Sequence, residues 1–556
     1  MGIGELLLER GLITAEHLAA ATTARNRTGQ RVDRALVEMG CVSEQQMLEA
    51  TSEHLGIPMV DLADVKIDVE TLRCLPQKLV FRRGLVPLEK NNGTLRLATS
   101  DPFDLYSIDE VRMLTGLEVE PVLAPAEEIE KVIKAYYGVG GETVDEMMDS
   151  TDLEIIDEDA PDGGDLLEMA QEASVIKLVN EVFLEAIKER ATDIHIEPYE
   201  NDLVIRYRVD GVLQHTAMPV QIRRFQAAII SRIKIMAHLN IAEKRLPQDG
   251  RIQVKMGGRQ FDVRVSVIPM LHGEGVVMRL LDRSTALFTL PQLGMQEDTF
   301  AIFHDVIARP HGILLVTGPT GSGKTTTLYA ALEEIVSPAI KVVTIEDPVE
   351  YNLPGVNQIH VLPKIGLTFA RGLRHILRHD PDVIMIGEIR DLETAEAAVQ
   401  AALTGHLVLS TLHTNDAASS ATRLLDMGVE PFLVTSTLEA AMAQRLVRTI
   451  CLECKQEYTP DPAELPRDFQ YRPGQTLWRG AGCRKCRGTG YHGRTGLFEL
   501  MVTSRPIREK IMARAPSGDV LAAATGEGLR LLREDGWTKV RDGITTLEEV
   551  IRATKA

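Results

Sequence analysis

Short apolar runs alternate with longer helical stretches through the C-terminal half of the chain. The runs are Ile313–Thr317, Lys341–Ile345, Val383–Ile386 and Leu407–Ser410. Strands of a parallel sheet are buried on both faces, so they read as nearly continuous apolar segments rather than as alternating ones. The pattern from Gly312 onward therefore predicts an α/β domain built on a parallel sheet.

A mixed pattern precedes this part. Helices are expected at Val175–Lys188 and Phe225–His238, and strands at Asp193–Glu197, Leu203–Val209, Arg251–Val254, Gln260–Val267 and Gly275–Leu281. Short strands interspersed with helices predict a compact α+β domain that ends near Asp282.

The N-terminus contains an internal repeat, in which Ile3–Thr22 aligns with Val32–Thr51. Each copy predicts a short helix, a turn at Gly11 or Gly40, and a second helix. Two copies are too few for a solenoid, so the duplicated helical hairpin is expected to pack as one small module with the stretch that follows it.

An acidic segment separates the N-terminal module from the α+β domain, and the net charge of the chain limits the classes of function that are expected. Residues 142–165 carry eleven Asp and Glu and no Lys or Arg, which predicts an extended acidic linker. The net charge of −19 argues against a nucleic-acid coat or a broad surface for anionic membranes. No apolar run reaches about 18 residues, and the first residues lack the apolar core of a secretory signal, so a cytoplasmic protein is expected.

A glycine-rich loop joins the first predicted strand of the α/β domain to a helix. Its residues are Gly318-Pro319-Thr320-Gly321-Ser322-Gly323-Lys324-Thr325. Backbone N–H groups of such a loop converge on phosphates, and the helix N-terminus favours an anion. Lys324 is expected to bridge the β- and γ-phosphates of ATP, Thr325 to offer its hydroxyl to Mg²⁺, and Thr326 to join the nucleotide contacts. The alternative is a chance glycine-rich turn, which the full motif in its strand-to-helix context disfavours.

Carboxylates follow two further strands. Glu388 ends an apolar run and is expected to act on Mg²⁺ or its waters, because α/β sheets bind ligands at the carboxyl ends of their strands. Glu346, Asp347 and Glu350 follow another strand, and one of them is expected to polarise the attacking water. For Glu346 and Asp347, a helix cap or a surface ion pair is the alternative to a nucleotide contact.

Four of the six cysteines form two close pairs, Cys451 with Cys454 and Cys483 with Cys486. Four thiolates can complete a tetrahedral Zn²⁺ shell, and a closed shell indicates a structural metal rather than a catalytic one. Redox chemistry is the alternative, but no thioredoxin-like unit surrounds the pairs.

Several longer motifs resemble those of a known family, the secretion traffic ATPases, which are the hexameric motors of type II secretion and type IV pili. Thr344–Tyr351 (TIEDPVEY) is similar to the family's Asp box, Asp380–Asp391 (DPDVIMIGEIRD) to its Walker B motif, and Thr404–Asn415 (TGHLVLSTLHTN) to its His box. The stretches Ala191–Pro198, Tyr207–Leu213 and Leu246–Ile252 are also similar.

The resemblance implies a multidomain α/β and α+β fold. It implies an N-terminal docking module rich in helical hairpins at 1–140, the acidic linker at 141–165, a PAS-like α+β domain at 166–284 that clamps nucleotide, and a RecA-like P-loop ATPase domain at 285–556. The last domain includes the tetracysteine element at 451–486 and a C-terminal helical part.

The resemblance also implies residue roles for ATP hydrolysis. Glu350 is expected to be the general base and His413 to sense the γ-phosphate. Arg264 and Arg279 are expected to reach the nucleotide from the α+β domain, because a guanidinium fork suits spread phosphate charge. Arg374 and Arg378 are further candidates from the core domain. For each arginine taken singly, a surface ion pair is the alternative.

The partners that the resemblance implies are other copies in a homo-hexamer, an inner-membrane platform protein, and a membrane-anchored docking protein bound by the N-terminal module. This places the protein at the inner face of the cytoplasmic membrane. The N-terminal repeat resembles a module that binds cyclic di-GMP in some relatives. However, Gly2-Ile3-Gly4 and Arg31-Val32-Asp33 stand where that module has Arg-Leu-Gly, so a docking role is favoured.

Within the family, the tetracysteine element resembles assembly motors rather than retraction motors. Gly164–Asn180 and Leu532–Arg552 look closer to the type II secretion motor than to the type IV pilus extension motor. Two other classes are weighed, a DNA-handling P-loop motor and a nucleotide-dependent scaffold that does not hydrolyse. The acidic balance and the lack of a basic stretch with interleaved aromatics count against the first of these.

Overall fold

The computed structural model describes residues 3–28, 31–62, 65, 67–72, 74–91, 93–137, 173–256, 259–282, 288–472 and 474–555. The expected acidic linker at 141–165 lies outside the described residues. The chain divides into two compact units, Met1–Leu281 and Asp282–Ala556, which are described separately. The finer division into four parts stays a prediction.

Two helical hairpins begin the first unit, as the repeat predicts. They comprise α1 (Ile3–Glu9), α2 (Ala15–Thr28), α3 (Val32–Glu38) and α4 (Glu44–Leu55). Gly11 and Gly40 adopt the same left-handed conformation, with φ of +69° in both, which ends the first helix of each pair. Ser43 caps α4 by a reciprocal pair of hydrogen bonds with Gln46. The predicted duplication is therefore confirmed as a structural repeat.

A small α/β layer follows the hairpins. It contains α5 (Val69–Leu72), α6 (Gln77–Arg83), β1 (Leu85–Asn91), β2 (Thr94–Thr99), α7 (Leu105–Thr115), β3 (Glu118–Leu123) and α8 (Ala126–Tyr137). Strand β2 lies centrally, antiparallel to β1 and parallel to β3. The hydrophobic core of this layer joins the three-stranded sheet to α6, α7 and α8.

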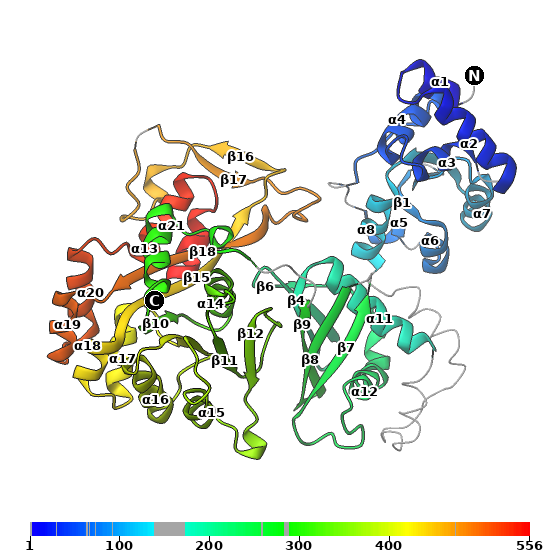
Figure 1. Ribbon diagram of the computed structural model, residues 1–556. Coiled ribbons are helices and arrows are strands. Elements are labelled where there is room, and N and C mark those ends of the chain that lie inside the picture. Colours follow the sequence, from blue (N-terminus) through cyan, green and yellow to red (C-terminus); the bar gives the residue numbers. More distant parts are fainter. Residues whose placement is uncertain are drawn as a thin grey trace. The chain divides into compact units, whose positions relative to one another are not determined.

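A six-stranded sheet makes up the rest of the first unit. Its elements are α11 (Ala173–Lys188), β4 (Ala191–Pro198), β5 (Leu203–Val209), β6 (Val212–His215), η1 (Val220–Phe225), α12 (Gln226–Met236), β7 (Gln248–Met256), β8 (Arg259–Met270) and β9 (Gly273–Asp282). The strand order is β6-β5-β4-β9-β8-β7. Helices α11 and α12 pack on one face (Figure 1). There Phe183 and Ile229 join the apolar side chains of the strands in one core. The alternate positions of β4, β5 and β9 carry charged side chains, so the other face is polar.

The second unit is built on a seven-stranded sheet. Its strands are β10 (Gly312–Thr317), β11 (Val342–Glu346), β12 (Val356–His360), β13 (Val383–Ile386), β14 (Leu407–Leu412), β15 (Leu438–Ile450) and β18 (Tyr491–Val502). The order is β12-β11-β13-β14-β10-β15-β18, with every neighbouring pair parallel except β15 and β18. The four predicted strands are present with small shifts at their ends. Strands β12, β15 and β18 were not predicted.

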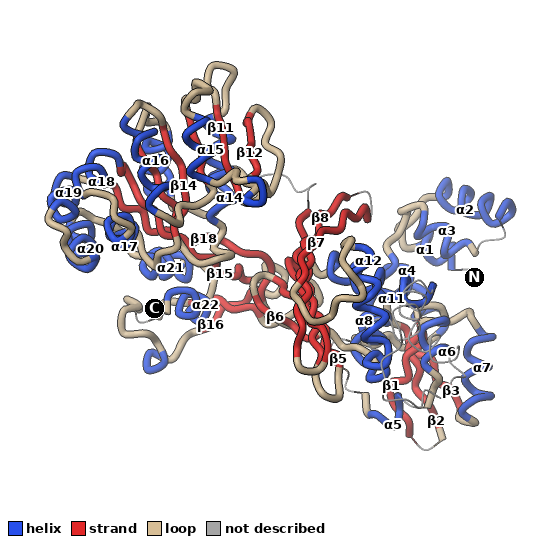
Figure 2. Tube along the Cα trace, turned by 90° about the horizontal axis from the view of Figure 1, so that it is seen from below, coloured by secondary structure: helices blue, strands red, loops and turns tan. Residues whose placement is uncertain are grey.

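Helices cover both faces of this sheet (Figure 2). On one face lie α15 (Phe369–Ile376), α16 (Leu392–Leu403), α17 (Ala418–Asp426) and α18 (Pro431–Thr437). On the other face lie α13 (Glu297–Ile307), which follows η2 (Leu290–Leu293), and α14 (Lys324–Ile335). The parallel strands thus have two apolar faces, which explains their continuous hydrophobic runs.

The C-terminal part adds helices and a two-stranded ribbon. These are β16 (Lys455–Tyr458), η4 (Pro462–Glu464), β17 (Leu477–Gly480), α19 (Arg505–Met512), α20 (Ser517–Gly526), α21 (Leu532–Arg541) and α22 (Leu547–Thr554). A small core of Phe469, Leu477, Trp537 and Val550 fixes the ribbon against α21 and α22. None of the described helices is long and apolar enough to cross a membrane.

Candidate nucleotide site and metal centre

The glycine-rich loop runs from the end of β10 to the start of α14. A Cβ atom at Gly318 would lie 2.5 Å from the backbone carbonyl oxygen of Gln444 on β15, and Gly323 has a φ of +88°. A larger residue at Gly318 would collide with backbone, and a non-glycine residue at Gly323 would be strained. The loop therefore needs these glycines to lie flat against β15.

Lys324 lies at the first position of α14 and is buried. Its Nζ donates hydrogen bonds to the carbonyl oxygens of Gly318 and Pro319, both at 2.9 Å. Burial lowers the pKa of Lys324 to about 8, the charge of Glu388 opposes this shift, and the charge of Arg445 adds to it. The ammonium is thus held within the loop rather than extended into solvent.

The turn after β13 and the loop after β14 bring two more predicted residues together. Glu388 forms an ion pair with Arg390, and its Oε2 lies 3.3 Å from His413 Nε2. Two hydroxyls of β14 fix this turn: Ser410 Oγ donates to the carbonyl oxygen of Ile386 (2.9 Å) and Thr411 Oγ1 to that of Gly387 (2.7 Å). Since β13 and β14 are neighbouring parallel strands, their carboxyl ends place Glu388 and His413 side by side.

The three carboxylates that follow β11 lie in different surroundings. Glu346 is buried, and both of its oxygens accept hydrogen bonds from neutral side chains. Asp347 is exposed and Glu350 is partly exposed. Of the three carboxylates, only those of Asp347 and Glu350 are therefore accessible to solvent.

The four predicted arginines divide between the units. In the second unit, Arg374 forms an ion pair with Glu393 at 2.7 Å, and Arg378 donates to the carbonyl oxygen of Arg374. In the first unit, Arg279 on β9 donates from Nε to Asp193 Oδ1 at 3.1 Å. Arg264 stands on β8 opposite Arg251 of β7. Their roles toward nucleotide stay predictions.

Sequence reasoning missed two residues of β15 that support the loop. Gln444 accepts a hydrogen bond from Thr327 of α14 at 2.8 Å. Arg445 donates to the carbonyl oxygens of Gln444 (3.0 Å) and Asn415 (2.9 Å), and burial lowers its pKa. Through β15, these contacts connect α14 to the loop that contains His413 and Asn415. No recognised motif surrounds Gln444-Arg445, and the only signal was a polar pair closing an alanine-rich apolar stretch.

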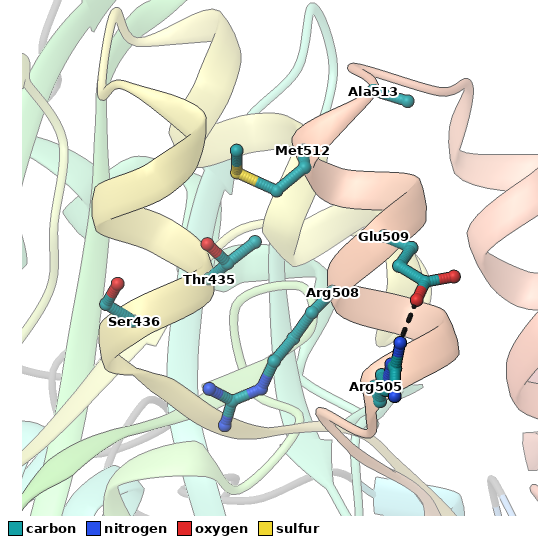
Figure 3. Close-up of a pocket in the computed structure, with 7 residues that line it drawn as sticks. All are labelled: Thr435, Ser436, Arg505, Arg508, Glu509, Met512 and Ala513. Carbon is teal, nitrogen blue, oxygen red and sulfur yellow. Dashed lines mark hydrogen bonds and ion pairs between the residues drawn. The ribbon is translucent and has the colours of Figure 1, made fainter.

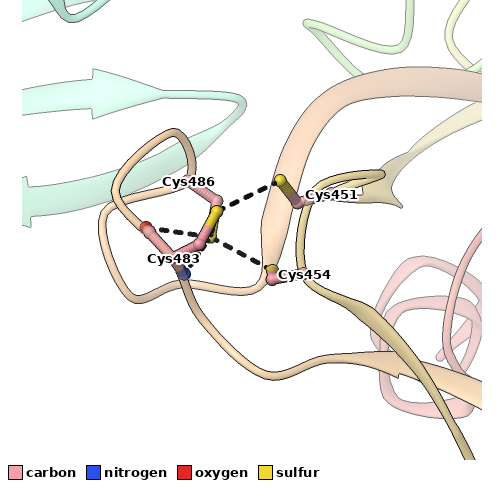
Figure 4. A group of neighbouring side chains, drawn as sticks. All are labelled: Cys451, Cys454, Cys483 and Cys486. Carbon is pink, nitrogen blue, oxygen red and sulfur yellow. Dashed lines mark hydrogen bonds between the residues drawn. The ribbon is translucent and has the colours of Figure 1, made fainter. Parts of the chain in front are cut away.

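The four paired cysteines come from the chain segment that joins β15 to β18, and their side chains point toward one another (Figure 4). Their Sγ atoms all lie within 4.8 Å of one another, with 3.7 Å between Cys451 and Cys483 and 3.6 Å between Cys454 and Cys486. Burial raises the pKa of Cys454 to about 12. Burial also acts to raise the pKa of Cys486, but N–H groups of Cys483 and Gly490 donate to its sulfur and lower the value to about 7. Four converging sulfurs with backbone N–H donors fit a tetrahedral Zn²⁺ site.

A separate open depression of about 580 Å³ lies between α18 and α19 (Figure 3). It is lined by Thr435, Ser436, Arg505, Arg508, Glu509, Met512 and Ala513. Residues 435 and 436 belong to the last turn of α18, which ends immediately before β15, so the depression adjoins the amino end of that strand. The phosphate loop follows the carboxyl end of β10, which is parallel to β15, so the depression is not part of the nucleotide site.

A phosphate-binding loop at the carboxyl edge of a parallel sheet, with carboxylates and a histidine after the neighbouring strands, defines a P-loop ATPase. The family model of the type II/IV secretion system protein matches residues 168–552, and that of the MshEN domain matches residues 55–143. The chain belongs to the type II/IV secretion system protein family.

Two relatives match along the whole chain. A type II secretion system protein E from Xanthomonas campestris pv. campestris is 46% identical, with 100% of this chain and 98% of the relative covered. The type IV pilus assembly ATPase PilB of Myxococcus xanthus is 42% identical, with 99% and 98% covered. The solved structure of the Yersinia pseudotuberculosis ATPase DotB covers 72% of this chain and 97% of its own, with a TM-score of 0.51 and 21% identity, which shows a shared fold.

These matches confirm the family resemblance that the motifs indicated. They also confirm the predicted fold, which combines an α/β ATPase domain, a preceding α+β part and an N-terminal module. The chain is an ATP hydrolase of this family, and ATP with Mg²⁺ are the ligands that membership implies. The residues of the phosphate loop fit both, since they present backbone N–H groups, the buried Lys324 and the Thr325 hydroxyl.

Proposed function

We propose that the chain is the ATPase that powers pseudopilus assembly for type II protein secretion. The observation that carries this is the match to a type II secretion system protein E over the whole of both chains. The second candidate is a type IV pilus extension motor, which the full-length match to PilB favours.

Complementation distinguishes the two candidates. In a strain that lacks this gene, loss of secreted enzymes with normal surface pili is the expected result, and the intact gene restores secretion. Loss of pili with normal secretion would instead establish the extension motor. The measurement is enzyme activity in the culture medium beside a count of surface pili.

In the proposed mechanism, Lys324 and the backbone N–H groups of the loop bind the β- and γ-phosphates of ATP. Thr325 and Glu388 would hold Mg²⁺, which neutralises charge on the phosphates. Glu350 accepts the proton of the attacking water, and His413 contacts the γ-phosphate. Arg264, Arg279, Arg374 and Arg378 are proposed further contacts to phosphate.

Glu350→Gln is expected to lower ATP turnover about 100-fold or more, because a glutamine amide cannot accept the proton and general-base catalysis contributes about 10² to 10⁴. Binding of a fluorescent ATP analogue should be retained. Phosphate release and fluorescence titration measure the two effects. Glu509→Gln is the matched control, since Glu509 is exposed on α19 and pairs only with Arg505 among the described residues. Turnover of Glu350→Gln equal to wild type would remove Glu350 as the base.

The proposed assembly is a homo-hexameric ring, since head-to-tail contacts that close form rings. Its proposed partners are an inner-membrane platform protein and a membrane-anchored protein that docks on the N-terminal module, which places the ring in the cytoplasm against the membrane. Two ion pairs support docking over cyclic di-GMP binding: Arg31 pairs with Asp33 and, at 2.7 Å, with Asp101. The Arg31 guanidinium thus already contacts two carboxylates of its own module.

A further inference from the structure

The buried carboxylate of Glu346 ends β11 beside the candidate nucleotide site. It is 3% exposed, and its hydrogen-bond partners among the described residues are neutral side chains. Its Oε2 accepts from the Tyr329 hydroxyl, and its Oε1 accepts from Thr344 Oγ1 (2.6 Å) and Gln358 Nε2 (3.1 Å). Burying a carboxylate is costly even when it is hydrogen-bonded, so stability alone explains this arrangement poorly.

Two of these donors, Tyr329 and Gln358, also hold the chain segment that contains Glu350. The Tyr329 oxygen accepts the backbone N–H of Glu350 at 3.3 Å. Gln358 Nε2 donates to the carbonyl oxygen of Tyr351 at 2.9 Å, and Gln358 Oε1 accepts the N–H of Leu353 at 2.8 Å. The rings of Tyr329 and Tyr351 meet edge to face, with centroids 6.2 Å apart. Two side chains therefore fix the backbone from 350 to 353.

These two side chains come from elements on either side of the segment. Tyr329 is on α14, the helix that begins with Lys324, and Gln358 is on β12, the neighbour of β11. Burial and the adjacent Glu346 raise the pKa of Tyr329, so the phenol stays protonated and donates to the carboxylate. Glu346 thereby orients Tyr329, and Tyr329 connects the phosphate-loop helix to the backbone of Glu350.

We propose that Glu346, Tyr329 and Gln358 form a positioning network that sets Glu350 relative to the phosphate loop. The three residues act through Glu350 and do not touch nucleotide. This proposal rests on the proposed role of Glu350 as general base, and it assigns Glu346 to positioning rather than to the nucleotide contact expected from the sequence.

Tyr329→Phe is the principal test, because it removes the hydroxyl and keeps the ring. The kcat for ATP is expected to fall about tenfold, since a displacement of about 1 Å at a catalytic group can cost about 100-fold. The KM for ATP and the affinity for a fluorescent ATP analogue should change less than about twofold, as expected for a loss confined to the chemical step. Full-length protein is used throughout, with phosphate release as the rate measurement.

The matched control is Tyr491→Phe, in which a partly buried phenol loses a comparable hydrogen bond, to Thr546 Oγ1 at 2.8 Å, away from the site. Its kcat should equal that of wild type. In a Glu350→Gln background, Tyr329→Phe should lower the residual rate no further, because the base that Tyr329 positions is already absent. If Tyr329 had a purely structural role, the substitution would lower the rate by the same factor in both backgrounds.

An unchanged kcat in Tyr329→Phe would overturn the proposal, and so would a fall in affinity that matches the fall in kcat. If Tyr329→Phe does not fold, Gln358→Ala at its partly buried position provides the second test, with the same expected fall in kcat and the same retained affinity. Wild-type turnover in Glu350→Gln alone would count against the assigned base instead, so the two failures are distinguishable.

Discussion

Lys324→Ala is expected to abolish ATP turnover and to weaken nucleotide binding. The ammonium is buried against the loop carbonyls of Gly318 and Pro319, and no other lysine lies in the loop. In the proposed mechanism, removing it leaves the charge on the β- and γ-phosphates without its partner, and a lost electrostatic contact of this kind lowers kcat by about 10² to 10³. Phosphate release with purified full-length protein measures the effect.

The control for this substitution is Lys510→Ala on the exposed side of α19, which should hydrolyse ATP at the wild-type rate. Light scattering should find both variants in the same assembly state as wild type. Full ATPase activity of Lys324→Ala would end the ATPase interpretation.

The depressed pKa of Lys324 adds a pH dependence. The ammonium is charged below about pH 8 and loses its proton as the pH rises through that value in the nucleotide-free protein. Phosphate binds the charged form, so kcat/KM, which reports on the free enzyme, should decline above about pH 8.

Loss of zinc is the second change with a large expected effect. Purified, reduced protein should contain about one Zn²⁺ per chain, as four thiolates complete one shell. Cys486→Ser should lose the metal and lower the midpoint of thermal unfolding by about 5 °C or more, because structural zinc contributes directly to folding free energy. Elemental analysis and a thermal scan measure the two effects.

Cys74→Ser serves as the control for the zinc experiment. Cys74 is a half-buried cysteine of the first unit and belongs to no cysteine cluster there. Its substitution should leave metal content and unfolding unchanged. A zinc content near zero in fresh wild-type protein would refute the structural metal.

Sequence reasoning succeeded where a function demands a fixed local geometry. The phosphate loop needs glycines, a lysine and a hydroxyl residue in consecutive positions, so its motif is visible without a structure. Buried parallel strands such as Val383–Ile386 are likewise visible, because burial on two faces leaves a continuous apolar run. The spacing of the two cysteine pairs correctly predicted that the four sulfurs lie together, because metal ligation restricts the spacing of its ligands.

The sequence did not predict β15, whose residues Leu438–Ile450 include alanine, leucine, glutamate and arginine, all good helix formers. Tertiary packing overrides that propensity. Strand β15 lies between β10 and β18, and its buried Ala440, Ala441 and Ala443 contribute to the packing of the sheet. Gln444 and Arg445 were missed for the same reason.

Contacts between distant segments were also beyond the sequence. The partners of Glu346 come from positions 329, 344 and 358, and only the folded sheet and helix bring them together. The three carboxylates Glu346, Asp347 and Glu350, within five residues, therefore could not be sorted into buried and exposed members from spacing alone.

The cysteine element is inserted between two strands, β15 and β18, that pair with each other at the edge of the ATPase sheet. Ile450 and Tyr491 are direct antiparallel partners, so the chain leaves the sheet edge and returns to it at one point. The whole excursion between them, with its ribbon and four cysteines, is an enlarged hairpin loop. A hairpin loop can lengthen or shorten without rethreading the strands around it, so this element is a replaceable appendage whose presence or absence leaves the order of the sheet intact.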